Sequence, residues 1–181
     1  MTAQNEIDFP RRLKDKDEIK IIAEAEAIGD RAFSHILPML RAGMTELEVA
    51  IEIENFMRRE GATKTSFDTI CASGVRSCMP HGVATDKVIE MGDFLTMDFG
   101  CVYKGYCSDM TRTVVFGEPT QKQREVYQTV LRAQKEVLEN VKAGMKCVDI
   151  DTIARKVILD AGYGDNFTHS LGHSVGIDIH E

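Results

Sequence analysis

Three absences narrow the class of protein that this sequence encodes. No apolar run approaches the ~18 residues that a membrane-spanning helix needs, and residues 1–12 are polar, without the hydrophobic segment of a signal peptide. Lysine and arginine form no cluster longer than Arg11-Arg12 or Arg58-Arg59, and 29 acidic residues outnumber 22 basic ones. We therefore expect a cytoplasmic protein with neither nucleic acid nor membrane as a partner.

Cysteine is present, but not in the spacing of a disulfide framework or a zinc knuckle. The five cysteines are an odd number, and no two of them form a C-x-x-C motif. We therefore expect reduced thiols that serve as small core residues. A chain of 181 residues with 43% apolar composition can fold around one core without a metal, so any bound metal would serve chemistry.

The first half of the sequence predicts a helical pair followed by strands. Apolar residues at spacings of three and four predict a helix over 17–40, closed by Pro38. Thr45 and Glu48 form a capping box that starts a second helix, which reaches Gly61. Strands are expected at 65–72, 80–83, 94–102 and 106–116.

The helical pair recurs about a hundred residues later. A second long amphipathic stretch covers 126–141, and Gly144 and Gly162 follow Gly43 and Gly61 by 101 positions each. The recurrence predicts two pseudo-symmetric halves, whereas two unrelated helical hairpins are the alternative. Because few residues follow the second pair, we expect part of a second sheet to be missing from this chain.

Two aspartates lie in the predicted hairpin. A two-residue turn at Lys104-Gly105 would place Gly100 opposite Asp109. Asp98 then lies diagonally across from Asp109 on the same face, with the carbon atoms ~7 Å apart or less. Two such carboxylates repel each other unless a cation neutralises them. The pattern favours a divalent metal site, and a hydrated surface face is the alternative.

Histidines form the second candidate cluster. His169, His173 and His180 lie within twelve residues, and the neighbouring Gly172 and Gly176 allow close approach of the backbone. A lone histidine is usually structural, but three in one short stretch indicate a ligand or metal site. Nitrogen together with carboxylate ligands suits Mn, Fe, Co or Zn better than Ca or Mg.

A further histidine, His81, lies between the rigid Pro80 and the flexible Gly82, which would aim its imidazole into a cleft. A simple turn histidine is the alternative. His180 follows it by 99 positions, close to the offset of the repeat. Pseudo-symmetry would then place the two on opposite sides of one cleft.

Several ordered motifs together resemble the creatinase, methionine aminopeptidase and prolidase family. They are PHG at 80–82, MDFG at 97–100, YCSDMTRT at 106–113, HSLGHSVG at 169–176 and IHE at 179–181. The resemblance implies an α/β (α+β) pita-bread fold with two pseudo-symmetric halves, each a helix pair plus an antiparallel sheet. Residues 1–181 would then form a single peptidase-like domain, with a first half at about 13–117 and a partial second half at about 118–181.

The resemblance also implies a dinuclear metal centre. Asp98 and Asp109 would be ligands, with Asp109 bridging, and His173 would add a nitrogen ligand. Manganese is the expected ion, with cobalt, iron or zinc as alternatives. Two glutamates that complete the centre in the family would fall beyond Glu181, so the activity of this chain as given is in question.

The same resemblance assigns the substrate site. His81, His169 and His180 would line it, and His180 with His81 would donate hydrogen bonds during catalysis. The stretches at 66–74 and 169–173 look like the Xaa-Pro branch, which implies an aminopeptidase or dipeptidase acting on Xaa-Pro peptides. A homodimer is compatible with this branch. The alternatives are a methionine aminopeptidase and a non-catalytic peptide- or protein-binding module on the same scaffold.

Overall fold

The computed structural model describes residues 10–181, and a long helix lies near the start of this range. Helix α2 spans Lys16–Ile36 and begins at a capping box, in which the Asp15 side chain accepts from the Glu18 N–H and the Glu18 side chain accepts from the Asp15 N–H. Pro38 lies in the 3₁₀ helix η1 (Leu37–Met39), so the α-helix ends before it. The predicted helix is confirmed, and residues 1–9 of the polar segment 1–12 lie outside the described residues.

Helix α3 spans Glu46–Arg59 and begins at the predicted capping box of Thr45 and Glu48. It ends just before Gly61, whose φ of +104° lies in the left-handed region that favours glycine. Helices α2 and α3 contact each other and form the first helical pair.

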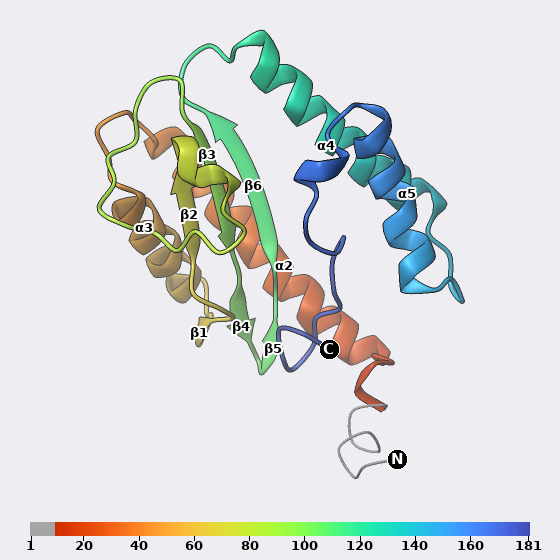
Figure 1. Ribbon diagram of the computed structural model, residues 1–181. Coiled ribbons are helices and arrows are strands. Elements are labelled where there is room, and N and C mark those ends of the chain that lie inside the picture. Colours follow the sequence, from red (N-terminus) through yellow and green to blue (C-terminus); the bar gives the residue numbers. More distant parts are fainter. Residues whose placement is uncertain (1–9) are drawn as a thin grey trace. The chain divides into compact units, whose positions relative to one another are not determined.

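Two small antiparallel sheets follow (Figure 1). Their strands are β1 (Lys64–Thr65), β4 (Cys101–Tyr103) and β5 (Tyr106–Cys107) in one sheet, and β2 (Ile70–Ser73), β3 (Phe94–Phe99) and β6 (Met110–Val115) in the other. The predicted strands at 94–102 and 106–116 are therefore each broken into two. The expected strand at 80–83 was wrong, because Val83 makes only an isolated bridge with Ile70 after the 3₁₀ helix η2 (Gly74–Cys78).

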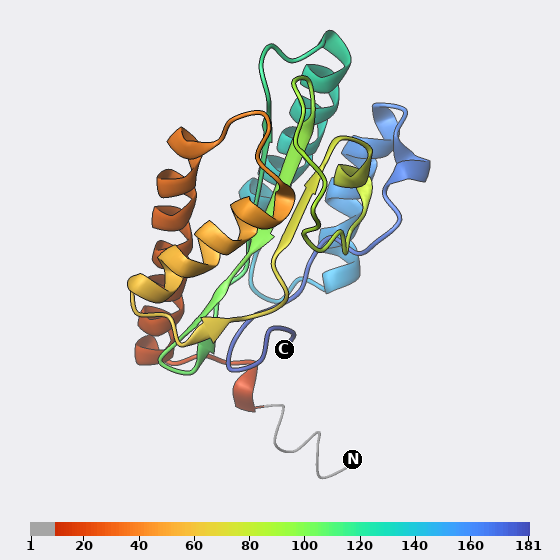
Figure 2. The same ribbon diagram turned by 90° about the vertical axis from the view of Figure 1, so that its left-hand side faces the viewer.

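The larger sheet separates a core face from a polar face. Leu95, Met97 and Phe99 are fully buried against α2 and α3, whereas Thr96 and Asp98 alternate with them and are half-buried. Figure 2 shows the two helices on one face of the sheet and the segment that contains η2 on the other. The candidate acidic residues therefore lie on the face turned away from the helical core.

The contact pattern divides the chain into two compact units. The first unit is the chain up to Glu118 together with Ser174–Glu181, and the second is Pro119–His173. The second unit contains α4 (Gln121–Asn140), α5 (Cys147–Asp160) and the 3₁₀ helix η3 (Gly164–Asn166), and residues 119–173 contain no strand. Helix α4 begins earlier than predicted, at a capping box of Thr120 and Gln123.

The helical pairs of the two units match in detail. Helices α3 and α5 both have 14 residues, and Gly144 and Gly162 have φ values of +88° and +84°, as Gly43 and Gly61 have +95° and +104°. Ile53 of α3 is buried, and its counterpart Ala154 of α5 is buried as well. The structure therefore supports the repeat.

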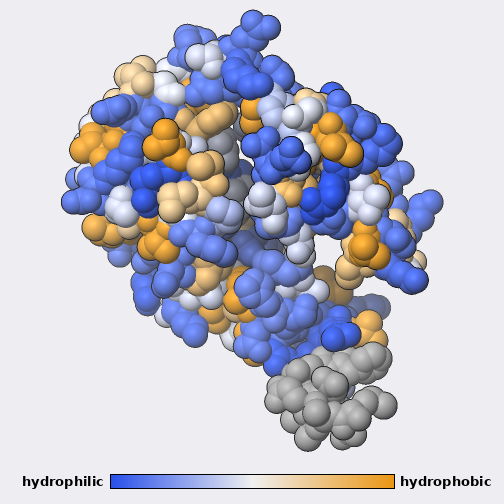
Figure 3. Space-filling model, viewed as in Figure 1, coloured by the Kyte–Doolittle hydropathy of each residue, from blue (hydrophilic) through white to orange (hydrophobic). Residues whose placement is uncertain are grey.

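The cysteines differ in their exposure to solvent. Three cysteines are buried as predicted, but Cys78 and Cys147 are exposed, so the expectation of core thiols was wrong for these two. On the face shown in Figure 3, hydrophobic residues lie scattered among hydrophilic ones. Within residues 10–181, no helix combines the length and the apolar character needed to cross a bilayer.

Candidate metal centre

The hairpin formed by β3 to β6 brings Asp98 and Asp109 to the same face. Asp98 pairs with Thr111 and Val102 pairs with Cys107, so a single register runs through the hairpin and places Gly100 opposite Asp109. The two carboxylates are therefore diagonal neighbours, as predicted. The turn is also as predicted, because Lys104 and Gly105 have φ values of 48° and 89°.

The two aspartates lie on a partly shielded face of the sheet. Both residues are half-buried. The apolar residues that alternate with Asp98 along β3 face the helices, and the shielding of the acidic face comes instead from the adjacent strand β2. Ile70, which pairs with Asp98, and Ala72 are buried there. Partial shielding of this kind strengthens the attraction of a carboxylate pair for a cation.

A hydroxyl group orients one of the carboxylates. The Thr111 side chain lies directly across the strand from Asp98, and its Oγ1 donates a hydrogen bond to Asp98 Oδ1 at 2.8 Å. The next cross-strand pair on this face, Thr96 and Thr113, also joins its hydroxyls, at 3.3 Å. Our sequence interpretation missed Thr111, although its position opposite Asp98 follows from the predicted register.

His81 lies in a loop on the same side of the sheet. Val83 bridges Ile70, which in turn pairs with Asp98 on the next strand. A Cβ atom at Gly82 would come within 2.9 Å of the Cβ of Ala72, so the loop runs directly over β2. His81 is exposed, and its role at a cleft stays a prediction from the sequence.

A buried carboxylate holds the base of the His81 loop. Glu46 is fully buried and accepts hydrogen bonds from the Ser73 N–H at 2.7 Å, from Thr85 Oγ1 at 2.7 Å and from Arg76 Nε at 3.1 Å. Arg76 also donates to the Val83 carbonyl at 2.8 Å. Burial opposes ionisation of Glu46, but these hydrogen bonds outweigh it, so the pKa lies below its ordinary value. No local sequence pattern indicates this role.

His180 belongs to the first unit through the segment Ser174–Glu181. The Cys107 N–H donates to the Gly176 carbonyl at 2.7 Å, which places this segment beside β5, two residues before Asp109. His180 is exposed.

Glu181 anchors the segment that carries His180. Its carboxylate accepts from the Ile177 N–H at 2.9 Å and from Lys14 Nζ at 2.8 Å, and it also pairs with Arg11. Burial opposes ionisation, but the partners Lys14, Asp178 N–H and Arg11 stabilise the charged form and lower the pKa of Glu181 to about 2. The carboxylate therefore remains ionised at neutral pH.

The remaining histidines, His169 and His173, lie in the second unit. Arg155 of α5 donates to the His169 carbonyl at 3.0 Å and pairs with Asp151 at 2.8 Å. Asp151 accepts in turn from the Leu171 N–H at 2.8 Å. The segment between the two histidines is thus tied to α5 by a charged pair, another long-range contact that the sequence did not indicate.

The donor chemistry of the hairpin fits a divalent cation. Two carboxylates on one half-shielded face supply oxygen ligands that Mn²⁺ and similar ions accept. Within residues 10–181, no three His, Cys, Asp or Glu side chains form a group that could hold a metal ion. The hairpin therefore presents two candidate carboxylate ligands.

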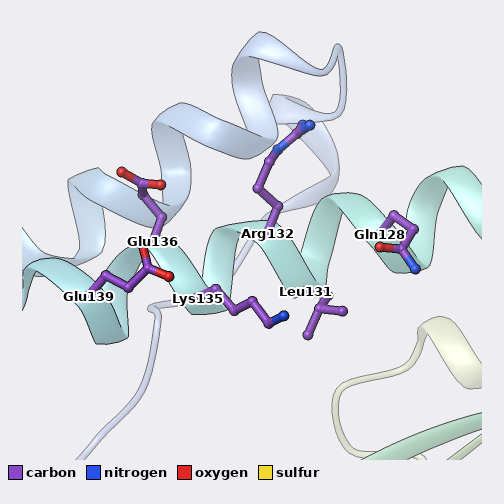
Figure 4. A pocket seen from close by; sticks show the side chains of 6 residues that line it. All are labelled: Gln128, Leu131, Arg132, Lys135, Glu136 and Glu139. Atoms are coloured by element: carbon purple, nitrogen blue, oxygen red, sulfur yellow. The ribbon is translucent and has the colours of Figure 1, made fainter.

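A shallow hollow elsewhere has no relation to these residues. It has a volume of about 240 Å³, and Figure 4 shows that all of its lining side chains come from α4. They are Gln128, Leu131, Arg132, Lys135, Glu136 and Glu139. The hollow includes none of the predicted site residues and does not define a candidate active site.

The fold places the protein in a known class. Its helix pairs and antiparallel sheets match the pita-bread architecture of prolidase structures. Residues 20–181 match metallopeptidase family M24, and the chain belongs to this family. The family resemblance of the sequence motifs is thereby confirmed.

Two curated relatives show the extent of the similarity. The Xaa-Pro dipeptidase of Pyrococcus furiosus is 51% identical over 171 residues, which are 94% of this chain and 49% of the relative. The uncharacterized peptidase YqhT of Bacillus subtilis is 50% identical, over 94% of this chain and 48% of the relative. The chain thus spans about half the length of these relatives.

Solved structures give the same result. The Xaa-Pro dipeptidase from Bacillus anthracis superimposes with a TM-score of 0.96 at 51% identity, over 98% of this chain and 50% of that one. The prolidase from Pyrococcus furiosus has a TM-score of 0.97 at 49% identity, over 100% of this chain and 54% of that one.

Proposed function

We propose that this chain is part of a metal-dependent aminopeptidase or dipeptidase that cleaves the N-terminal peptide bond of Xaa-Pro peptides. The observation that carries the proposal is the diagonal pair of Asp98 and Asp109 on the half-shielded face of one hairpin. Membership of family M24 and the similarity to proteins described as Xaa-Pro dipeptidases support it.

In this proposal Asp98 and Asp109 would hold the metal ions, and the family resemblance of the sequence implies a shared role for Asp109 and a nitrogen ligand from His173. Manganese is the proposed ion, with cobalt, iron and zinc as the alternatives that the donor set permits. The Thr111 hydroxyl fixes the Asp98 carboxylate, because it donates to Oδ1. A cytoplasmic location and a homodimer stay predictions from the sequence.

Divalent ions, when bound, supply polarisation of the scissile carbonyl and a water acidic enough to attack it near neutral pH. The protein itself supplies the hydrogen-bond donors. His81 and His180 lie in exposed segments on either side of the hairpin, where a peptide can reach them, and they donate to the developing oxyanion and the departing nitrogen. The assignment of His169 to the substrate site stays a prediction from the sequence motifs.

A chimaera tests the proposal without requiring activity from the chain alone. This chain would replace the matched 171 residues of the Pyrococcus furiosus dipeptidase. With Mn²⁺, the chimaera should release free amino acids from Ala-Pro but not from Met-Ala. The Asp98→Asn chimaera should lose at least ~10²-fold in kcat/KM.

The other outcomes identify the alternatives. Cleavage of Met-Ala in preference to Ala-Pro would indicate a methionine aminopeptidase. Saturable binding of Ala-Pro without cleavage, in a folded chimaera, would indicate a binding module and would contradict the proposal.

A further inference from the structure

The hairpin is interrupted at the residue pair that includes Asp109. Strand β3 ends at Phe99 and β4 begins at Cys101. On the returning side of the hairpin, β5 ends at Cys107 and β6 begins at Met110. The register does not change across the gap. The Gly100 carbonyl accepts from the Ser66 N–H at 3.1 Å, on the side of β1.

In this gap the Ser108 N–H keeps its bond to the Cys101 carbonyl at 2.8 Å, and side chains make the other hydrogen bonds. The Cys101 N–H donates to Ser108 Oγ at 3.0 Å, and Ser66 Oγ donates to the Ser108 carbonyl at 2.7 Å. A Cβ atom at Gly100 would overlap the Ser108 carbonyl oxygen, so the two chains approach here more closely than any other residue type permits. The gap is therefore held by specific hydrogen bonds from the side chains of Ser66 and Ser108.

A further side-chain partner of the gap comes from helix α2. The Asp109 N–H donates to Oε1 of Glu26 at 3.1 Å. Because Cys101 and Ser108 form a hydrogen-bonded pair, the next pair, Gly100 and Asp109, is non-hydrogen-bonded, and the Asp109 N–H points away from the partner strand to the open edge, where Glu26 accepts it. Met110, the next residue, is buried and contacts Gly29 of the same helix. By alternation, the Asp109 side chain points to the opposite face, where Asp98 lies.

Glu26 is an unusual residue for its position. Burial raises its pKa, and it is half-buried among apolar residues of α2 such as Ala25 and Ile28, which are fully buried. A half-buried carboxylate among apolar residues costs free energy of folding unless a hydrogen-bond donor pairs with it. Glu24, on the same helix, is exposed and pairs with Arg31.

We infer that Glu26 is a positioning residue for the metal centre, which fixes the Asp109 peptide through its N–H and thereby directs the Asp109 carboxylate toward Asp98. This inference deepens the proposed function and rests on it, because the direction of the Asp109 carboxylate matters only if Asp109 binds a metal ion. The required property of Glu26 is a hydrogen-bond acceptor at the end of a side chain of this length, and its charge is not required.

Three variants separate the acceptor from the charge. Glu26→Met keeps the length and removes the acceptor, Glu26→Gln keeps length and acceptor and removes the charge, and Glu24→Met is the matched control on the same helix. Two quantities are measured on the 181-residue chain. They are the hydrogen-exchange rate of the Asp109 amide by NMR and the affinity for Mn²⁺ by calorimetry.

We expect the Asp109 amide to exchange at least ~10-fold faster in Glu26→Met, while the amides of β3 keep their protection. Mn²⁺ binding should weaken by about 10–100-fold in the same variant, the usual effect of losing a group that orients a ligand. Glu26→Gln and Glu24→Met should match the wild type in both measurements.

Each contrary result has a distinct meaning. Equal exchange rates in wild type and Glu26→Met would overturn the inference, as would equal Mn²⁺ affinities in two folded proteins. If Glu26→Gln weakens Mn²⁺ binding as much as Glu26→Met does, charge is responsible and the inference is wrong. If Glu26→Met does not fold, faster Asp109 exchange in Glu26→Gln likewise refutes it. Absence of Mn²⁺ binding by the wild type would count against the proposed metal site, and amide exchange would then decide on Glu26 alone.

Discussion

Thr111 Oγ1 lies 2.8 Å from Asp98 Oδ1, directly across the antiparallel pair of β3 and β6. The hydrogen bond occupies one carboxylate oxygen and limits rotation of the other, as groups that orient metal ligands do. Because Thr111 is exposed, its hydroxyl contributes little to the core, and its substitution separates function from stability.

Thr111→Val should therefore weaken Mn²⁺ binding by about 10-fold or more, with a change in unfolding free energy within about 0.5 kcal/mol. Thr113→Val on the same strand is the matched control, since Thr113 bonds Thr96 and not an aspartate. Calorimetric titration and urea denaturation measure the two quantities. Equal Mn²⁺ affinity in Thr111→Val and wild type would remove the assigned role.

Glu46 provides a prediction about stability. Its buried carboxylate joins α3, the end of β2 and the His81 loop through Ser73, Thr85 and Arg76. Glu46→Ala leaves the Arg76 charge without this partner and should lower the free energy of unfolding by about 3–5 kcal/mol. The control Asn55→Ala, at an exposed position of α3, should change it by less than about 0.5 kcal/mol. Similar urea midpoints for the two variants would show that the network is dispensable.

Glu181 gives a pH dependence with a definite sign. Its pKa is lowered from 4.5 to about 2, so the folded state favours the ionised form. The stabilisation is fully present above pH 4.5 and is lost as the pH falls toward 2. Glu181→Gln should be about 2 kcal/mol less stable than wild type at pH 7, the usual worth of a hydrogen bond to a charged group, and the difference should shrink below pH 4.5. A difference that stays constant with pH in urea titrations would contradict the assignment.

The thiols can be counted chemically. Cys78 and Cys147 are exposed, whereas burial raises the pKa of Cys71 to about 12. At pH 8 a thiol reagent should modify two cysteines of the folded chain quickly and all five after denaturation. Rapid modification of a third thiol in the folded chain would show that the core around β2 opens more readily than the structure implies.

Sequence reasoning succeeded where the determining interactions are local. The capping box at Thr45 and the turn at Lys104-Gly105 depend on residues within a few positions of one another. The turn then sets the register, and the register alone brings Asp98 and Asp109 together. The family motifs supplied the fold beyond these elements.

The residues that sequence reasoning missed act over long distances in the chain. Glu26 accepts from the Asp109 N–H, 83 positions later in the chain, and the Ser66 hydroxyl donates to the Ser108 carbonyl, 42 positions later. No periodicity records such contacts, because each depends on the tertiary packing of α2 and β1 against the hairpin. The exposed Cys78 was misjudged for the same reason, since the expected strand after it forms only one bridge.

The metal site itself is tested most directly by adding Mn²⁺ to the isotope-labelled chain and recording which NMR signals its unpaired electrons broaden. Binding between Asp98 and Asp109 should broaden the signals of Thr96, Thr111 and Thr113 first, leave Asn55 on α3 sharp, and disappear in Asp98→Asn. Broadening that is unchanged in Asp98→Asn, or that centres on another acidic surface, would contradict the account.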